Sequence, residues 1–149
     1  MNNQNVIIEE IVEFTPIVGN AVRHLVAQLD DGFQPLTDED VNEMIKADNT
    51  HLFLARLAQD SAEIVGMFTL VVYRIPYKKK AWVEDLVVDR DFRRQGIAKK
   101  MLHIAIEEAK KLDIKSLNLT SSPTREYAGH IYQQLGFEKR DTSVYRISF

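Results

Sequence analysis

Residues 81–120 combine a strand pattern, a helix pattern and a second strand pattern, and this order constrains the fold more than any other feature of the chain. The run 81–88 is apolar and β-branched, residues 96–112 place small and apolar side chains on one helical face, and 116–120 is a second short apolar run. Two strands of one sheet that are joined through a helix are parallel, and such crossovers are nearly always right-handed. The sequence therefore predicts a parallel strand pair inside an α/β or α+β domain.

The residues before this unit are patterned differently. Strand patterns cover three stretches, residues 6–8, 51–58 and 63–75. Two helix patterns lie between the first two: one begins at Pro16 and is stopped by Asp30-Asp31-Gly32, and the other follows Thr37 as its N-cap. Short turns at Asp60-Ser61 and at residues 76–80 separate the later strands. Strands joined by short turns pair antiparallel, so we expect a mixed sheet.

The C-terminal part predicts one more helix and one more strand. Ser122 followed by Pro123 is typical of a helix start, and Gly136 is typical of a helix end. Residues 143–149 resemble a last strand, and a short strand near Glu138 is compatible with the pattern. A chain of 149 residues without a linker rich in Pro, Gly or Ser predicts a single domain over residues 1–149.

The composition excludes several functional classes. The chain has no cysteine, which excludes disulfides, thiolate zinc sites, iron–sulfur clusters and a cysteine nucleophile. The four histidines have no metal-ligand spacing, so we expect no metal. The formal net charge of −3 argues against nucleic-acid binding. No apolar run approaches the roughly 18 residues of a membrane span, and the N-terminus does not resemble a secretory signal, so we expect a cytoplasmic protein that does not bind membranes.

The turn after residue 88 carries the clearest chemical signal. An apolar strand runs into Arg93-Arg94-Gln95-Gly96, and Ile97 then opens a helix. The first amides of a helix have no internal partner and carry partial positive charge, and a glycine lets a ligand approach the backbone closely. These are the elements of a pyrophosphate site. An ordinary strand–turn–helix with basic capping residues explains the same residues. The Rossmann and P-loop glycine patterns are both missing.

Two motifs in this region resemble those of one family. Arg93-x-x-Gly96-x-Ala98 resembles the Q/R-x-x-G-x-G/A signature of the GNAT superfamily of acyl-CoA-dependent N-acyltransferases. Ala128-x-x-Ile131-Tyr132-x-x-Leu135-Gly136-Phe137 resembles the family's second signature, A-x-x-L/F-Y-x-x-x-G-F. The order and separation of the two motifs match the family, and the predicted elements fit it over nearly the whole chain. The resemblance implies a GNAT-like fold: a mixed, mostly antiparallel sheet with a central parallel strand pair and about four flanking helices.

The resemblance also implies roles for individual residues. Main-chain groups of Leu86, Val87 and Val88 would pair with the pantetheine arm of acetyl-CoA, the expected cosubstrate. The pyrophosphate would lie against the turn and the helix start, formed by Arg93, Arg94, Gln95, Gly96, Ile97, Ala98 and Lys99. Tyr132 occupies the family's general-acid position, where it would protonate the departing thiolate. Without the resemblance, a tyrosine on an apolar helical face is typical of a core.

One position departs from the family pattern, and the position of the general base is not fixed by it. Arg125 stands where many members have an asparagine that helps hold the cofactor, and an arginine there would contact phosphate or an acidic acceptor group. The general base is expected to be Glu84. Its neighbour Asp85 points to the opposite face of a regular strand, so only one of the two carboxylates faces the reaction unless a bulge intervenes. The alternative is that both face solvent and that water relays the proton.

The reaction implied is transfer of an acetyl group from acetyl-CoA to a primary amine by direct attack. The alternative is a non-catalytic acyl-CoA-binding sensor or interaction module with the same fold; a transferase for longer acyl chains also stays open. The acceptor is a small-molecule or peptide amine. Residues 15–50 are acidic, which favours a cationic acceptor such as a polyamine, an amino sugar or a basic peptide end. A homodimer is compatible with the sequence.

Overall fold

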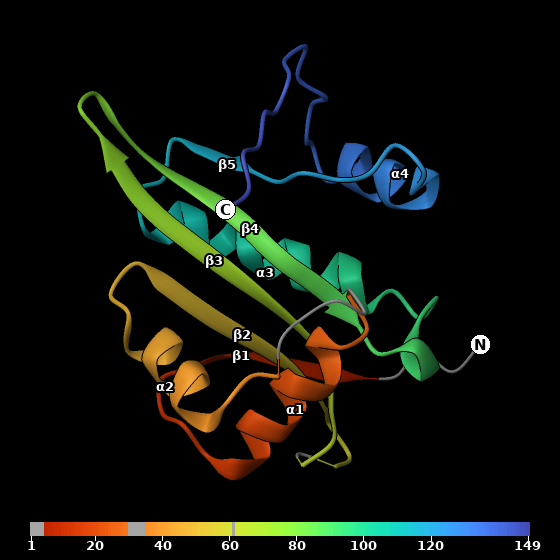
Figure 1. Ribbon diagram of the computed structural model, residues 1–149. Helices are drawn as coiled ribbons and strands as arrows, with labels where there is room; N and C mark the ends of the chain where they lie inside the picture. Colours follow the sequence, from red (N-terminus) through yellow and green to blue (C-terminus); the bar gives the residue numbers. More distant parts are fainter. Residues whose placement is uncertain (1–4, 30–34, 61) are drawn as a thin grey trace. The chain divides into compact units, whose positions relative to one another are not determined.

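The computed structural model describes residues 5–29, 35–60 and 62–149, and it divides into two compact units, Met1–Leu119 and Thr120–Phe149. The first unit holds one five-stranded sheet with the order β1-β2-β3-β4-β5 (Figure 1). Its strands are β1 (Val6–Ile11), β2 (Thr50–Leu57), β3 (Ile64–Ile75), β4 (Lys78–Val88) and β5 (Ser116–Asn118). The first four pair antiparallel and β5 pairs parallel with β4, which confirms the predicted mixed sheet with one parallel pair.

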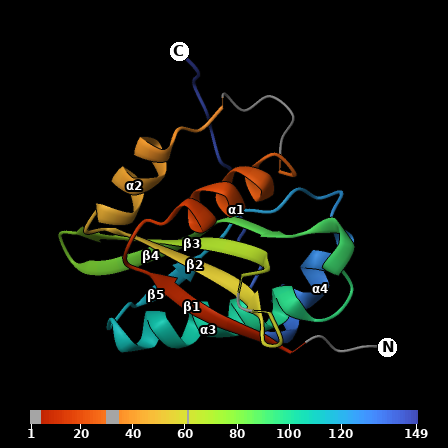
Figure 2. The same cartoon turned by 90° about the horizontal axis from the view of Figure 1, so that it is seen from below.

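Three helices cover the two faces of this sheet. Helices α1 (Pro16–Val26) and α2 (Asp38–Lys46) lie on one face, and α3 (Ile97–Lys111) lies on the other (Figure 2). Between α1, α2 and the sheet, the buried core consists of Val18, Val22, Leu25 and Val41 from the helices and of Ile11, Leu52, Leu54, Ile64, Met67 and Val87 from the strands. On the opposite side, α3 buries Met101, Leu102 and Ala105. Helices therefore cover part of both faces of the sheet.

The first two helices begin as their sequences predict. The Thr15 hydroxyl accepts a hydrogen bond from the Val18 amide, ahead of Pro16. Thr37 and Asp40 form a capping box, in which the Thr37 hydroxyl accepts from the Asp40 amide and the Asp40 carboxylate accepts from the Thr37 amide. The predicted stop at Asp30-Asp31-Gly32 lies outside the described residues, as does Ser61 of the predicted turn at Asp60-Ser61.

The β3–β4 hairpin is tighter than predicted. Only Pro76 and Tyr77 separate the two strands, and the three lysines that follow belong to β4. Lys78 pairs with Ile75 and Lys80 with Tyr73, so both lysines lie on the sheet rather than in a loop. A run of lysines suggested a turn because such runs are mostly solvated, but pairing with β3 extends the strand through them.

One β-bulge interrupts β4 near its middle. Met67 pairs with Val87 and Thr69 with Glu84, so β4 has one residue more than β3 between these pairs. Asp85 lies in the bulge with a φ of 50°, a left-handed conformation that Asp tolerates better than most residues. A bulge reverses the alternation of side chains along a strand. Glu84 and Val87 therefore lie on the same face of the sheet, the face of α1 and α2.

The second unit contains one helix, α4 (Glu126–Gln134). The helix start predicted at Ser122 is wrong: the N-cap is Arg125, and the Arg125 amide donates to the Ser122 carbonyl within a turn. The Ser122 hydroxyl bonds the Thr124 hydroxyl instead of capping a helix, a local alternative that serine and proline favour. Gly136 follows the helix with a φ of 91°, as predicted for a helix end.

The predicted last strand is also not formed. Residues 143–149, and those near Glu138, have no strand assignment in the described part of the second unit. Val144 and Tyr145 are exposed, with 74% and 92% of their surface accessible. An alternating apolar pattern makes a strand only where a neighbouring strand supplies the hydrogen-bond ladder. Sequence alternation alone did not reveal that no such ladder is present here.

Candidate functional site

A tightly bonded turn leads from β4 to α3. The Asp89 carboxylate accepts from the Asp91 amide and caps a short 3₁₀ helix, Arg90–Phe92. The Arg93 Nε then donates to the Val88 carbonyl at 2.9 Å, which fixes the turn to the end of the strand. Arg94 and Gly96 have φ values of 61° and 77°. Left-handed residues alternating with others turn successive amides toward one side, the geometry of an anion-binding backbone concavity.

The N-terminus of α3 differs from those of α1 and α2. Gly96 is its N-cap, no side chain caps it, and its first turn has no acidic residue. An ideal Cβ on Gly96 would meet no described atom within 4 Å, so the space beside this residue is open. Gln95 adds a buried Oε1 that has no hydrogen-bond partner among the described residues. An uncapped helix start fits an anionic group such as a pyrophosphate, whereas the Gln95 oxygen can only accept from a donor elsewhere on a ligand.

The edge of β4 that faces β5 is open next to this turn. The pairing of β4 with β5 ends at Trp82 and Asn118, where the Asn118 side chain donates to the Ala81 carbonyl at 3.2 Å. Beyond this point, Val87 and Val88 are paired with β3 alone, and Leu86, in the bulge, has no register partner in the described part of the chain. An unpaired strand edge is a template for an extended ligand. The three residues predicted to pair with pantetheine thus lie on an open edge.

A contact between α1 and the turn was not foreseen from the sequence. His24 Nε2 lies 2.5 Å from Asp89 Oδ2, and the Gln28 amide donates to the same oxygen at 3.1 Å. The Gln28 Oε1 in turn accepts from the Arg90 amide at 2.9 Å. Burial raises the pKa of Asp89, but the hydrogen bonds from the Asp91 amide, His24 and Gln28 outweigh it and hold the pKa below its ordinary value. No local pattern could predict this cluster, because α1 and the turn are about 65 residues apart.

Glu84 and Asp85 form a pair of partly desolvated carboxylates at the bulge. Burial raises the pKa of Glu84, and the negative charge of Asp85 raises it further. Burial also raises the pKa of Asp85. The bulge that sequence reasoning required for both carboxylates to be near one site is present. A carboxyl whose pKa is raised toward neutrality is better suited to accept a proton from an ammonium group.

The first unit brings most of the predicted site residues onto one strand, one turn and one helix start. These residues are Glu84, Leu86, Val87, Val88, Arg93, Arg94, Gln95, Gly96, Ile97, Ala98 and Lys99. The other two belong to the second unit. Tyr132 lies on α4, half-buried, with its ring edge-on to Phe137 at a centroid distance of 6.1 Å, and Arg125 is the exposed N-cap of the same helix.

Comparison with known proteins decides the family. The model of the acetyltransferase (GNAT) family matches residues 20–137. The chain belongs to the GNAT acetyltransferase family.

Within the described ranges, none of the helices combines the length and apolar character needed to cross a membrane, and no group of three or more His, Asp or Glu side chains could hold a metal ion.

Individual relatives in the GNAT family are distant. An uncharacterized N-acetyltransferase of Methanocaldococcus jannaschii is 26% identical over 98 residues, which cover 66% of this chain and 43% of the relative, less than half its length. A transcriptional regulator from Bacillus halodurans has the same fold, with 27% identity, a TM-score of 0.79, and coverage of 97% of this chain and 100% of its own. An aminoglycoside N-acetyltransferase in complex with CoA is 18% identical, with a TM-score of 0.76 and coverage of 97% and 95%.

Proposed function

We propose that this GNAT member is an acetyl-CoA-dependent N-acetyltransferase that acetylates a primary amine. The observation that carries the proposal is the open edge of β4 leading directly to the uncapped, left-handed start of α3. An extended arm ending in a pyrophosphate needs both features in this order: unpaired main-chain groups for the arm and converging amides for the phosphates. The CoA complex of the aminoglycoside N-acetyltransferase with the same fold supports this choice of cosubstrate.

Each part of the proposed cofactor site has a separate task. Main-chain groups of Leu86 and Val88 would bind the pantetheine arm along the strand edge. The amides from Arg94 to Lys99 would hold the pyrophosphate, and the Gln95 side chain offers its unpartnered oxygen to a donor on the ligand. Arg93 would shape the turn, because its Nε is bonded to the Val88 carbonyl, and its remaining guanidinium N–H groups stay candidates for a contact with the cofactor. Arg125 stays a candidate for a phosphate or an acidic acceptor group.

The chemical step needs a base, an oxyanion donor and an acid. Glu84, with its raised pKa, would accept a proton from the ammonium group so that the amine can attack the thioester carbonyl. A backbone amide near Val87 would stabilise the negative charge that develops on the carbonyl oxygen. The Tyr132 hydroxyl would protonate the departing thiolate. Alignment of the two substrates contributes to the rate in addition to these groups.

A panel of amines tests the proposal against the alternative of an acyl-CoA sensor. The protein is mixed with acetyl-CoA and, in turn, with polyamines, amino sugars and peptides; free CoA is followed over time and products are identified by mass. Sustained CoA release with one acetyl group added to an amine is the expected result. Tight acetyl-CoA binding with no product on any amine would favour the sensor. Hexanoyl-CoA run in parallel tests whether a longer acyl chain is preferred.

A further inference from the structure

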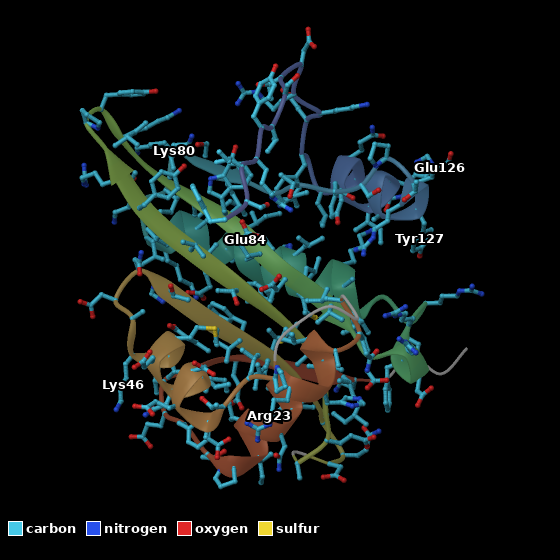
Figure 3. All side chains as sticks on the ribbon, viewed as in Figure 1. Arg23, Lys46, Lys80, Glu84, Glu126 and Tyr127 are labelled. Carbon is cyan, nitrogen blue, oxygen red and sulfur yellow. The ribbon has the colours of Figure 1, made fainter. Side chains whose placement is uncertain are left out.

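The N-terminal half of β4 and the facing half of β3 carry an unusual row of side chains on the α1/α2 face. Strand register places Thr69 opposite Glu84, Val71 opposite Trp82, and Tyr73 opposite Lys80. Alternate residues of a strand share a face, so the side chains of Tyr73, Lys80, Trp82 and Glu84 lie on the face that also carries Met67 and Val87. We call these four residues the acceptor strip. In Figure 3, Lys80 lies near the hairpin end of β4 and Glu84 lies further along the strand.

The helices of the first unit do not bury the acceptor strip. The β3 and β4 members of the α1/α2 core are Ile64, Met67 and Val87, all at the other end of the two strands. Tyr73, Lys80 and Trp82 are half-buried and Glu84 is exposed. The hairpin end of this sheet face therefore presents aromatic surface within the first unit, where a soluble fold would ordinarily place polar side chains.

The two aromatic rings of the acceptor strip are fixed to one another. The Trp82 Nε1–H donates a hydrogen bond to the Tyr73 hydroxyl at 3.0 Å. This bond joins the two strands diagonally across the sheet and gives the indole N–H its acceptor. The two half-buried rings thus form one joined aromatic surface, and aromatic surface suits the flat or aliphatic middle of a ligand.

The acceptor strip has opposite charges at its two ends. At one end Glu84 is accompanied by Asp85, and each has a raised pKa. At the other end the Lys80 ammonium lies 5.8 Å from the centre of the Tyr73 ring, and no carboxylate forms an ion pair with it in the described ranges. The hydrogen bond from Trp82 and the nearby charges of Lys80 and Lys78 lower the pKa of Tyr73, as a positive local field requires.

We propose that the acceptor strip binds an amine that also carries an anionic group, with the amine at Glu84, an apolar segment over Trp82 and Tyr73, and the anion at Lys80. Lys80 and Glu84 are four positions apart in β4, a span of roughly 13 Å along the strand. The inference rests on the proposed function, because Glu84 would face the attacking amine. The predicted charges of the acceptor do not depend on which residue is the base. The ligand needs a positive group for the carboxylate end of the strip and a negative group for its ammonium end.

A polyamine fits this face less well than the acidic composition of residues 15–50 suggested. Two of those carboxylates are already engaged: Asp38 forms an ion pair with Arg23 at 2.6 Å, and Asp40 belongs to the capping box of α2. A second ammonium group at the Lys80 end would meet a like charge. An acceptor with a distant carboxylate or phosphate would instead gain an ion pair there.

Two tetrapeptide amides that differ in one charge test the proposal. Gly-Ala-Ala-Glu and Gly-Ala-Ala-Gln present the same free amine, and about 10 Å of extended chain separates this amine from the fourth Cα. The measured quantity is kcat/KM for the Glu peptide divided by kcat/KM for the Gln peptide, at saturating acetyl-CoA. We expect a ratio of about five for the wild-type protein, the size of a partly exposed ion pair.

Three variants locate the source of that ratio. Lys80→Gln should bring the ratio to about one, and Lys80→Glu should invert it so that the Gln peptide is preferred. Lys79→Gln is the matched control: Lys79 lies on the opposite face, where its Nζ donates to the Leu112 carbonyl, so this variant should keep the wild-type ratio.

The outcomes separate this inference from the proposed function. A wild-type ratio near one, a ratio that Lys79→Gln changes as much as Lys80→Gln, or turnover of spermidine with no acetylation of either peptide would each overturn the anionic-acceptor assignment and leave acetyl transfer standing. Absence of acetylation on every amine, with acetyl-CoA bound, would overturn the proposed function itself.

Discussion

The two halves of β4 differ in the groups that they would offer to a ligand. From Leu86 onward, the strand edge, the turn and the start of α3 offer main-chain groups, and their positions are fixed by hydrogen bonds such as those of Asp89 and Arg93. Before the bulge, the strand offers side chains that stand on an open sheet face. A main-chain site suits a ligand that never changes, whereas a side-chain site can be altered by single substitutions without disturbing the fold.

This contrast predicts that substitutions divide by position. Changes beyond the bulge should act on acetyl-CoA binding, and changes before it should act on acceptor preference or on proton transfer. The bulge at Asp85 is the boundary, because it places the base candidate Glu84 on the same face as Val87 and gives the strand its extra residue. Each of the following variants either strengthens or breaks this division.

The largest effect is expected for Gly96→Glu. The added carboxylate would stand in the open space in front of the α3 amides and repel a pyrophosphate. We expect acetyl-CoA affinity, measured by calorimetry on the folded variant, to fall at least about 100-fold, which corresponds to about 2.8 kcal/mol. Backbone strain alone cannot explain such a loss, because it acts on stability.

Gly136→Glu is the matched control for that strain. Gly136 also has a left-handed backbone, with a φ of 91°, and an ideal Cβ there also meets no described atom within 4 Å. Both variants should therefore lose about 1–2 kcal/mol of folding free energy. Only Gly96→Glu should lose acetyl-CoA affinity. If the two folded variants bind acetyl-CoA with equal affinity, the pyrophosphate does not bind at the start of α3.

The second largest effect is expected for Tyr132→Phe. This change keeps the ring that packs edge-on against Phe137 and removes only the hydroxyl. General acid catalysis is typically worth about 10²–10⁴ in rate, and a CoA thiol is a fair leaving group, so we expect kcat to fall at least about tenfold and toward the low end of that range. Acetyl-CoA affinity should stay within about twofold, since no binding group is lost.

Tyr127→Phe is the corresponding control on the same helix. Tyr127 is 71% exposed and lies on α4, so the same removal of a hydroxyl should leave kcat unchanged. If Tyr132→Phe turns over within about twofold of the wild-type rate while acetyl-CoA binding is intact, the hydroxyl is not the acid, and Tyr132 has a packing role only.

The sequence predicted the strand end, turn and helix start of residues 86–99 far better than the arrangement of side chains before the bulge. The turn demands particular residues, above all Gly96 in a left-handed conformation before a helix, and such demands leave a readable motif. The helix start at Pro16 and the N-cap at Thr37 were predictable for the same reason, since each depends on neighbours in the chain. The parallel pair followed from the rule for two strands joined through a helix. Sequence patterns therefore predict best those features that depend on residues close together in the chain.

Features that depend on distant partners were not predictable. The bond between His24 and Asp89 joins segments far apart in the chain, and the hydrogen bond from Trp82 to Tyr73 depends on the strand register. The prediction of a strand at residues 143–149 was wrong for a related reason. A strand needs a neighbouring strand to pair with, and the alternating pattern does not show whether one is present. Ser122-Pro123 misled because a turn and a helix start use the same residues.

A smaller effect is expected for Asp89→Asn, which weakens the link between α1 and the turn. The asparagine Oδ1 can still accept from the Asp91 amide, but the charge-assisted bonds from His24 and Gln28 are lost or weakened. We expect the KM for acetyl-CoA to rise several-fold with little change in kcat or in the acceptor KM, and stability to fall by about 1 kcal/mol at pH 7.

The pH dependence of that stability loss follows from the lowered pKa of Asp89. A carboxyl whose pKa is lower in the folded protein stabilises it above the unfolded pKa, and this contribution disappears as pH falls through the folded value. The difference in the free energy of unfolding between wild type and Asp89→Asn, measured in urea, should therefore be largest at pH 7 and become smaller at acidic pH. Asp91→Asn, at the exposed neighbour, should show no such difference. An unchanged KM for acetyl-CoA would mean that α1 does not position the turn.

The smallest expected effect tests the boundary itself, through the pH profile of Asp85→Asn. Asparagine tolerates a left-handed backbone as aspartate does, so the bulge should persist. Removing the negative charge of Asp85 removes one of the two causes that raise the pKa of Glu84, and the base then ionises at lower pH. Because the base must be ionised to accept a proton, activity rises with pH through this pKa. The acid limb of kcat/KM for one fixed acceptor should therefore move to lower pH in the variant.

Asp113→Asn makes the same change at another left-handed aspartate, in the turn after α3, and should leave the limb in place. A limb that does not move, or that moves to higher pH, would show that Glu84 is not the group that titrates. Because the variant also lacks the Asp85 carboxylate, water would then replace Glu84 as the proton acceptor.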